Sequence, residues 1–253
     1  MRHARLVIAA AGLALLAVPA IAQEETPALT QQNWSFNGPF GTYDRASAQR
    51  GFQVYKEICA TCHSIRLAYY RDLTGIGLDE AQIAAIAASD QVPTLTDDGQ
   101  PTTRPGLPSD HFRSPYPNEA AARAVFNGAF PPDLSNIVNA RQGGADYLYA
   151  LLTGYREPPA DMKMGEGMNY NRYFPGHQIA MPQPLHDQQV TYADGTPATV
   201  DQMAKDVTTF LAFISNPEME VRKNTGVKVV LFLVFLTGLT YAVKRKVWAD
   251  VDH

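Results

Sequence analysis

Cys59-Ala60-Thr61-Cys62-His63 is the stretch around which the rest of the chain must be built. It holds both cysteines of the 253-residue sequence and ends on a histidine. Two thiols at this spacing can add to the two vinyl groups of one porphyrin, and the adjacent histidine can then ligate the iron. The motif therefore predicts one covalently bound c-type haem, enclosed by a fold that covers a flat apolar macrocycle.

Two other kinds of site also use closely spaced cysteines. A structural zinc site needs about four ligands, and no second pair of Cys or His at a comparable spacing follows the motif. A thioredoxin-like dithiol usually follows a strand, whereas a helical pattern precedes this motif. A redox dithiol remains the main alternative to haem attachment.

The periodicity of apolar residues predicts helices. Asp44 can cap a helix on which Phe52, Tyr55 and Cys59 share an inward face. Thr199-Val-Asp-Gln resembles a capping box, and the apolar residues that follow it form one face that should pack on the Phe52/Tyr55 helix. Shorter helices are expected at residues 79–88, after Asn118 up to Gly128, and at residues 146–153.

Long segments without regular periodicity separate these helices. Residues 23–43 should form irregular surface covering, and residues 91–117 form a turn-rich insertion with six prolines. Residues 158–196 also lack periodicity and hold the methionines Met162, Met164, Met168 and Met181. The predicted domain is all-α, with long proline-rich insertions.

The amino terminus has the composition of an export signal. Residues 1–22 carry two arginines, an apolar run and an Ala-x-Ala site, which together predict a cleaved signal peptide. Residues 23–221 are then expected to form a domain in the periplasm. That compartment suits covalent haem attachment.

The carboxyl terminus has the composition of a membrane anchor. Residues 229–243 carry no charge, and basic residues flank the run on both sides. Residues 222–253 are therefore expected to form one transmembrane helix and a short cytoplasmic tail in the bacterial inner membrane. Pro217 should break the helix that precedes the anchor.

The exported domain is acidic. Residues 23–221 carry 13 Lys and Arg against 23 Asp and Glu, a net charge near −10. This charge disfavours nucleic acid as a partner and favours a basic protein.

Several blocks of the sequence resemble one family. The sequence from Arg50 through the motif to Ser64, the segments 115–124, 128–135, 147–159 and 171–176, and Asp194-Gly-Thr-Pro-Ala-Thr are similar to the cytochrome c1 family, the haem subunit of bc1 complexes. The resemblance covers nearly all of the chain after residue 22 and includes the carboxyl-terminal anchor.

The resemblance implies a class I c-type cytochrome fold and an electron-transfer function. Electrons would arrive from a Rieske iron-sulfur protein and leave to a soluble cytochrome c, in a respiratory or photosynthetic complex that also contains cytochrome b. The chain would be the electron-transfer subunit of a quinol:cytochrome c reductase and would make no bonds itself. The alternative is a monohaem electron-transfer subunit of a terminal oxidase or a periplasmic dehydrogenase.

The resemblance also assigns site residues. Cys59 and Cys62 would bind the porphyrin, His63 would be the proximal ligand of the iron, and Met181 in Ile179-Ala-Met-Pro the distal one. Arg141 would meet a haem propionate. Some family members carry an additional cysteine pair that forms a disulfide, and its absence here means that another device must steady the Met181 loop.

Other residues compete with Met181 for the distal position. Met203 falls on an apolar helical face and suits the core, whereas Met219 lies next to the membrane. The remaining candidates are Met162, Met164, Met168, His177 and His186.

Overall fold

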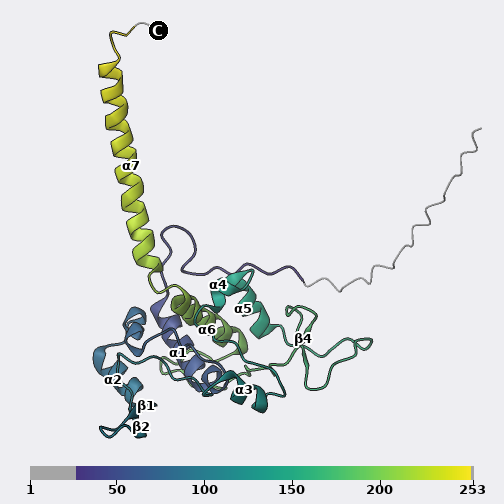
Figure 1. The fold of residues 1–253 in the computed structure, drawn as a ribbon. Coiled ribbons are helices and arrows are strands. Elements are labelled where there is room, and N and C mark those ends of the chain that lie inside the picture. Colours follow the sequence, from purple (N-terminus) through teal and green to yellow (C-terminus); the bar gives the residue numbers. More distant parts are fainter. Residues whose placement is uncertain (1–26, 252–253) are drawn as a thin grey trace, which may run out of the picture.

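The computed structural model describes residues 27–251, so the expected signal peptide lies outside the described residues. Figure 1 shows a domain of packed helices from which α7 projects alone, with α2 and the β1–β2 hairpin on one side of the domain and β4 on the other. The helices are α1 (Arg45–Glu57), α2 (Glu80–Ala88), α3 (Glu119–Val125), α4 (Ile137–Ala140), α5 (Gly144–Thr153), α6 (Val200–Ser215) and α7 (Met219–Val247), with the 3-10 helices η1 (Cys59–Thr61) and η2 (Tyr70–Ile76); the strands are β1 (Gln91–Leu95), β2 (Pro101–Pro105), β3 (Asn169–Tyr170) and β4 (Gln178–Ile179). The all-α prediction is confirmed.

The core of the domain is the contact between α1 and α6. The Phe210 ring of α6 lies 5.5 Å from that of Phe52 and 5.7 Å from that of Tyr55, as the apolar pattern predicted. A β-carbon at Gly51 would lie 2.0 Å from the carbonyl oxygen of Asp206, so only glycine lets the two backbones come this close. Burying each large side chain here contributes about 1.5–3 kcal/mol.

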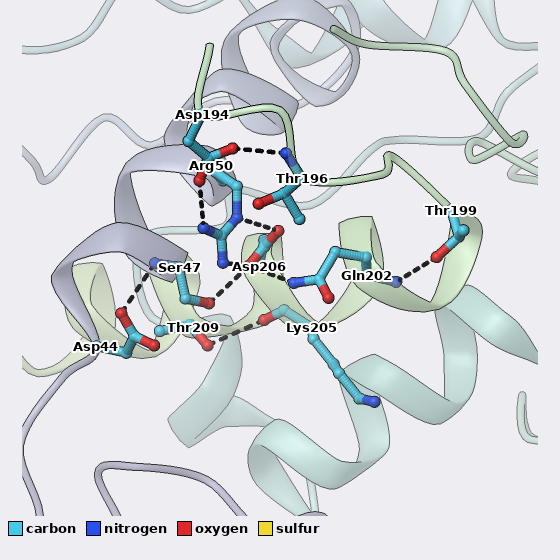
Figure 2. A network of polar contacts seen from close by, with 10 residues as sticks. All are labelled: Asp44, Ser47, Arg50, Asp194, Thr196, Thr199, Gln202, Lys205, Asp206 and Thr209. Atoms are coloured by element: carbon cyan, nitrogen blue, oxygen red, sulfur yellow. Dashed lines mark hydrogen bonds and ion pairs between the residues drawn. The ribbon is translucent and has the colours of Figure 1, made fainter. Parts of the chain in front are cut away.

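A buried ion pair lies within the same contact (Figure 2). Asp206 is fully buried and accepts hydrogen bonds from Arg50 Nε at 2.9 Å, Arg50 Nη2 at 3.0 Å and Ser47 Oγ at 2.7 Å. Gln202 Nε2 adds a fourth at 3.0 Å, and Arg50 Nη1 reaches out to Asp194 at 2.8 Å. The network links α1, α6 and the segment that precedes α6, and satisfies a carboxylate that would otherwise be costly to bury.

The helix caps follow the sequence closely. Asp44 Oδ1 accepts from the backbone N–H of Ser47 at 3.1 Å, and Asn118 Oδ1 accepts from that of Ala121 at 2.9 Å. Thr199 Oγ1 caps α6 by accepting from the backbone N–H of Gln202. The Gln202 side chain bonds to Asp206 and does not return to the backbone of Thr199. The expected capping box is therefore only half formed.

The proline-rich insertion is more ordered than predicted. Its first part, expected to be irregular, is an antiparallel hairpin of β1 and β2 closed by a bond from Thr96 N to Gln100 O at 2.9 Å. Both strands are edge strands, and proline is tolerated there at positions whose N–H would point away from the partner strand, because no hydrogen bond between the strands is lost. The expectation of a strand-free insertion was wrong for this reason.

The helix α7 has the length and composition to cross a membrane. It begins at Met219, after the break expected at Pro217, and every residue from 228 to 251 is exposed. Its first turns are tied to the domain by Glu220, which accepts from Tyr43 N at 2.7 Å, and by Lys223, which donates to the carbonyls of Phe36 and Gly41. The apolar surface is therefore presented at a fixed point on the domain.

Candidate haem-binding site

The cysteine motif follows directly from the end of α1. The turn η1 brings Cys62 N to 3.1 Å and His63 N to 2.8 Å from the carbonyl of Cys59. Both thiols are free and partly buried. One helical turn thus carries two thiols and an imidazole on a short rigid segment.

The electrostatics of the Cys59 thiol argue against a redox dithiol. Burial, with Cys62 adding to it, raises the pKa of Cys59 to about 12. Redox-active cysteines have lowered pKa values, because the thiolate is the reactive species. A Cys59 thiol with a raised pKa is a poor nucleophile for disulfide exchange.

His63 is oriented by a turn on the far side of the sequence. Its Nδ1 lies 2.8 Å from the carbonyl oxygen of Pro132, and because a carbonyl can only accept, Nδ1 carries the proton. Burial lowers the pKa of His63, although the Pro132 carbonyl and Asp133 act against that effect. The imidazole is therefore neutral at neutral pH, with its Nε2 lone pair available to a metal.

Asp133 fixes this turn against the motif. Its carboxylate accepts from Ser64 Oγ at 2.6 Å and from the backbone N–H of Arg66 at 2.9 Å, while Leu134 N donates to the carbonyl of Ser64 at 2.7 Å. Burial raises the pKa of Asp133, but hydrogen bonds led by Ser135 and Ser64 outweigh it and hold the pKa below its ordinary value. The ionised carboxylate keeps the Pro132 carbonyl in place.

Met181 lies two residues beyond β4 and is partly buried. Its carbonyl oxygen accepts a hydrogen bond from Tyr155 Oη at 3.1 Å. Met203 is fully buried in the core between α1 and α6, and Met219 is buried at the start of α7. Both of these competitors are thus occupied in packing.

Met164 and Met168, in the loop before β3, do not pack in the core. Met164 and Met168 line a cavity of about 320 Å³ with Arg156 and Glu157. His177 is buried, with Nδ1 3.3 Å from the carbonyl of Asn171, and His186 is exposed. These residues remain weaker candidates than Met181.

Arg141 is exposed at the end of α4. Its Nη1 lies 3.5 Å from the carbonyl of Ala140, and it makes no ion pair within residues 27–251. Burial raises the pKa of Tyr147, and the charge of Arg141 opposes that rise. The guanidinium is available to a carboxylate such as a propionate.

The donor set fits a c-type haem. The residues expected to hold it are two thiols, a neutral imidazole with Nδ1 engaged, the thioether of Met181 and a guanidinium with no carboxylate partner in the described part of the chain. No cluster of three or more His, Cys, Asp or Glu side chains within residues 27–251 could hold a metal ion without a porphyrin.

Sequence reasoning missed the residues that support the ligands. Nothing in the pattern of residues 130–134 connected Pro132 with His63, 69 residues away. Tyr155 and Asn171 fell in blocks that resembled the family but received no role. Both residues are polar and uncharged, and both lie in blocks that resemble the family but contain no expected haem ligand. That combination is the signal that could have identified them.

Comparison with known proteins gives a consistent answer. Residues 34–251 match the model of the Cytochrome C1 family. The chain is 43% identical to cytochrome c1 of Rhodospirillum rubrum over 266 aligned positions, covering 98% of each, and 50% identical to the mitochondrial cytochrome c1 heme protein of Saccharomyces cerevisiae, covering 86% of this chain and 71% of that one. It is also 48% identical to the protein named cytochrome b/c1 of Bradyrhizobium diazoefficiens, of which it spans 35%.

Proposed function

The chain belongs to the cytochrome c1 family, and we propose that it is the haem-carrying electron-transfer subunit of a bc1-type quinol:cytochrome c oxidoreductase. The observation that carries the proposal is the bond from His63 Nδ1 to the Pro132 carbonyl, directly beside the two thiols of the motif. Together they prepare one ligand and two attachment points for a single haem c. The all-α domain agrees with the class I c-type fold of the family.

Each residue has a separate task. Cys59 and Cys62 would each add sulfur to one carbon of a vinyl group and the thiol hydrogen to the other, and so would hold the macrocycle covalently. His63 would present Nε2 to the iron, while the Pro132 carbonyl fixes the orientation of the ring through Nδ1 and strengthens its donor character. When bound, the haem gains and loses one electron at its iron.

Met181 and Arg141 would tune the reduction potential of the bound haem. A thioether ligand in addition to histidine raises that potential, which suits acceptance of an electron from a Rieske centre. Arg141 balances the charge of a propionate with a fork of donors. Neither residue takes part in bond making, so the protein acts by ligand choice, burial and charge.

Partners and location follow from the family and from the charge. The relative named cytochrome b/c1 supports cytochrome b as a neighbour in the membrane. The resemblance supplies a Rieske protein as donor and a soluble cytochrome c as acceptor, and the acidic excess of residues 23–221 favours a cationic acceptor. Residues 1–22 would direct export, and residues 222–253 would anchor a periplasmic haem domain with the carboxyl end in the cytoplasm.

Purification of the tagged full-length chain from detergent-solubilised membranes tests this assignment. We expect cytochrome b and an iron-sulfur protein to co-purify, and the haem of this chain to be reduced when a quinol is added. A copper-containing oxidase subunit or a dehydrogenase in their place would overturn the assignment in favour of the alternative class.

The axial ligand is tested separately. Met181→Leu should retain the haem, lower its midpoint potential and allow carbon monoxide to bind the ferrous iron. Met203→Leu is the matched control, because the same substitution in the core should leave both properties unchanged. An unchanged potential in Met181→Leu would refute Met181 as the ligand.

A further inference from the structure

The segment that carries Met181 contains a fully buried polar residue with no part in the site described so far. Asn171 has no exposed surface, although it lies in a long stretch with little regular structure. A buried amide is costly unless its donors and acceptors are satisfied. Its contacts therefore show what holds the segment in place.

The side chain of Asn171 bonds in two directions. Nδ2 donates to the carbonyl of Leu151, in the last turn of α5, at 2.8 Å. Oδ1 accepts from the backbone N–H groups of Tyr173 at 3.0 Å and Phe174 at 3.2 Å. One amide thus closes the turn that follows it and fastens that turn to α5.

The backbone around Asn171 is held as well. Its N–H donates to the carbonyl of His177 at 2.9 Å, and Arg172 N donates to the carbonyl of Gly154 at 3.1 Å. A β-carbon at Gly154 would lie 3.1 Å from Asn171 Oδ1 and 2.6 Å from the ring of Tyr173, so glycine is required for this approach. The strand-like pairing of Tyr155 with Asn171 continues the contact.

This arrangement leads directly to Met181. Pairing of Asn169 with Ile179 in β3 and β4 fixes the register of the segment two residues before the methionine. Tyr155, held beside Asn171, then donates from Oη to the carbonyl of Met181 at 3.1 Å. A chain of short contacts therefore runs from α5 through Asn171 and Tyr155 to the backbone of the ligand.

We propose that Asn171 and Tyr155 are positioning residues that hold the Met181 backbone where its thioether can stay bound to the iron. The inference rests on Met181 being the ligand, as given under the proposed function. If the Met181 loop moves away from the iron, the sixth coordination position opens. The contacts of Asn171 and Tyr155, here called the clamp, therefore set the fraction of protein in the open state. Carbon monoxide binds only that fraction, so its apparent affinity reports how strongly the clamp holds the loop.

The experiment uses the full-length chain in detergent-solubilised membranes. The variants are Asn171→Ala, Tyr155→Phe and Met181→Leu, with Tyr149→Phe as the matched control, since it removes a tyrosine hydroxyl that bonds to Asp201 at the surface. Carbon monoxide affinity of the ferrous protein and midpoint potential are measured for each, with thermal unfolding in parallel.

Tyr155→Phe should raise the carbon monoxide affinity roughly two- to tenfold, the factor that corresponds to one neutral hydrogen bond. Asn171→Ala should raise it more than about tenfold, because three bonds are lost together. Both variants should lower the midpoint potential, and Tyr149→Phe should change neither property.

Two different results would overturn the inference, and they are distinguishable. If Met181→Leu alters affinity and potential while Tyr155→Phe and Asn171→Ala match the wild type, the ligand is correct and the clamp has no positioning role, even if Asn171→Ala unfolds at a lower temperature. If Met181→Leu alters neither property, the ligand assignment itself fails. Should Asn171→Ala not fold, the mild Tyr155→Phe substitution decides alone.

Discussion

The buried ion pair between Arg50 and Asp206 offers a quantitative test of how α1 and α6 are held together. Arg50→Met removes both guanidinium bonds to Asp206 and the bond to Asp194, while Ser47 and Gln202 still donate to the buried carboxylate (Figure 2). Removing one partner of a buried pair costs about 3–5 kcal/mol. For a chain of this size that loss lowers the unfolding temperature by roughly 6–20 °C.

The measurement is thermal unfolding of the full-length chain in detergent, followed by far-ultraviolet circular dichroism and haem absorbance. Lys205→Met is the matched control on α6, because Lys205 pairs with the exposed Asp201 and its loss should cost less than about 1 kcal/mol. The double variant Arg50→Met/Asp206→Leu should recover at least half of the loss, since replacing both charges removes the unpaired buried carboxylate.

Either of two results would refute this reasoning. The first is a loss in Arg50→Met no larger than in Lys205→Met, which would mean that water reaches Asp206. The second is a double variant at least as unstable as the sum of its single variants, which would mean that packing, and not charge pairing, is disrupted.

Three further outcomes are expected. Arg141→Gln should lower the midpoint potential, because loss of a nearby cation disfavours the added electron; potentiometric titration checks this. Asp133 has a lowered pKa, so its contribution to stability is complete above its unfolded pKa of about 4 and is lost as the pH falls through the folded value. Denaturant unfolding of Asp133→Asn should therefore show lower stability at neutral pH and a flatter acid limb. The second-order rate of electron transfer to a cationic cytochrome c should fall steeply with added salt, and a salt-independent rate would count against steering by the acidic domain.

Local signals predicted the helices well. Caps at Asp44, Asn118 and Thr199 act within a few residues, and apolar spacing identifies the face that a helix buries, so both are readable from one stretch of sequence. The hairpin at residues 91–105 was missed because its prolines indicate turns. Only the pairing of the two strands shows that these prolines lie where no N–H is needed for a bond between the strands.

Contacts between distant residues could not be predicted in the same way. Arg50 and Asp206 are 156 residues apart, and no periodicity connects them. One signal was present, because Asp206 falls three residues after Met203 and four before Phe210, on the apolar face of α6. A carboxylate at such a position must find a buried cation, although the sequence does not say which.

The candidate site divides along the same line. The thiols and the histidine lie within five residues, so their chemistry was evident from the motif. The supports of His63 and Met181 come from segments 69 and 26 residues away, and only folding brings them together. Assignment of Met181 and Arg141 rested on resemblance and remains a prediction.

Covalent attachment of one haem to Cys59 and Cys62 is the central claim, and intact-mass measurement of the purified chain under denaturing conditions tests it most directly. The expected mass is that of the processed chain plus one haem, with no colour extracted by acidified acetone. Cys59→Ser/Cys62→Ser should lose the added mass. A wild-type chain that shows the unmodified mass and releases its colour into the solvent would contradict the account.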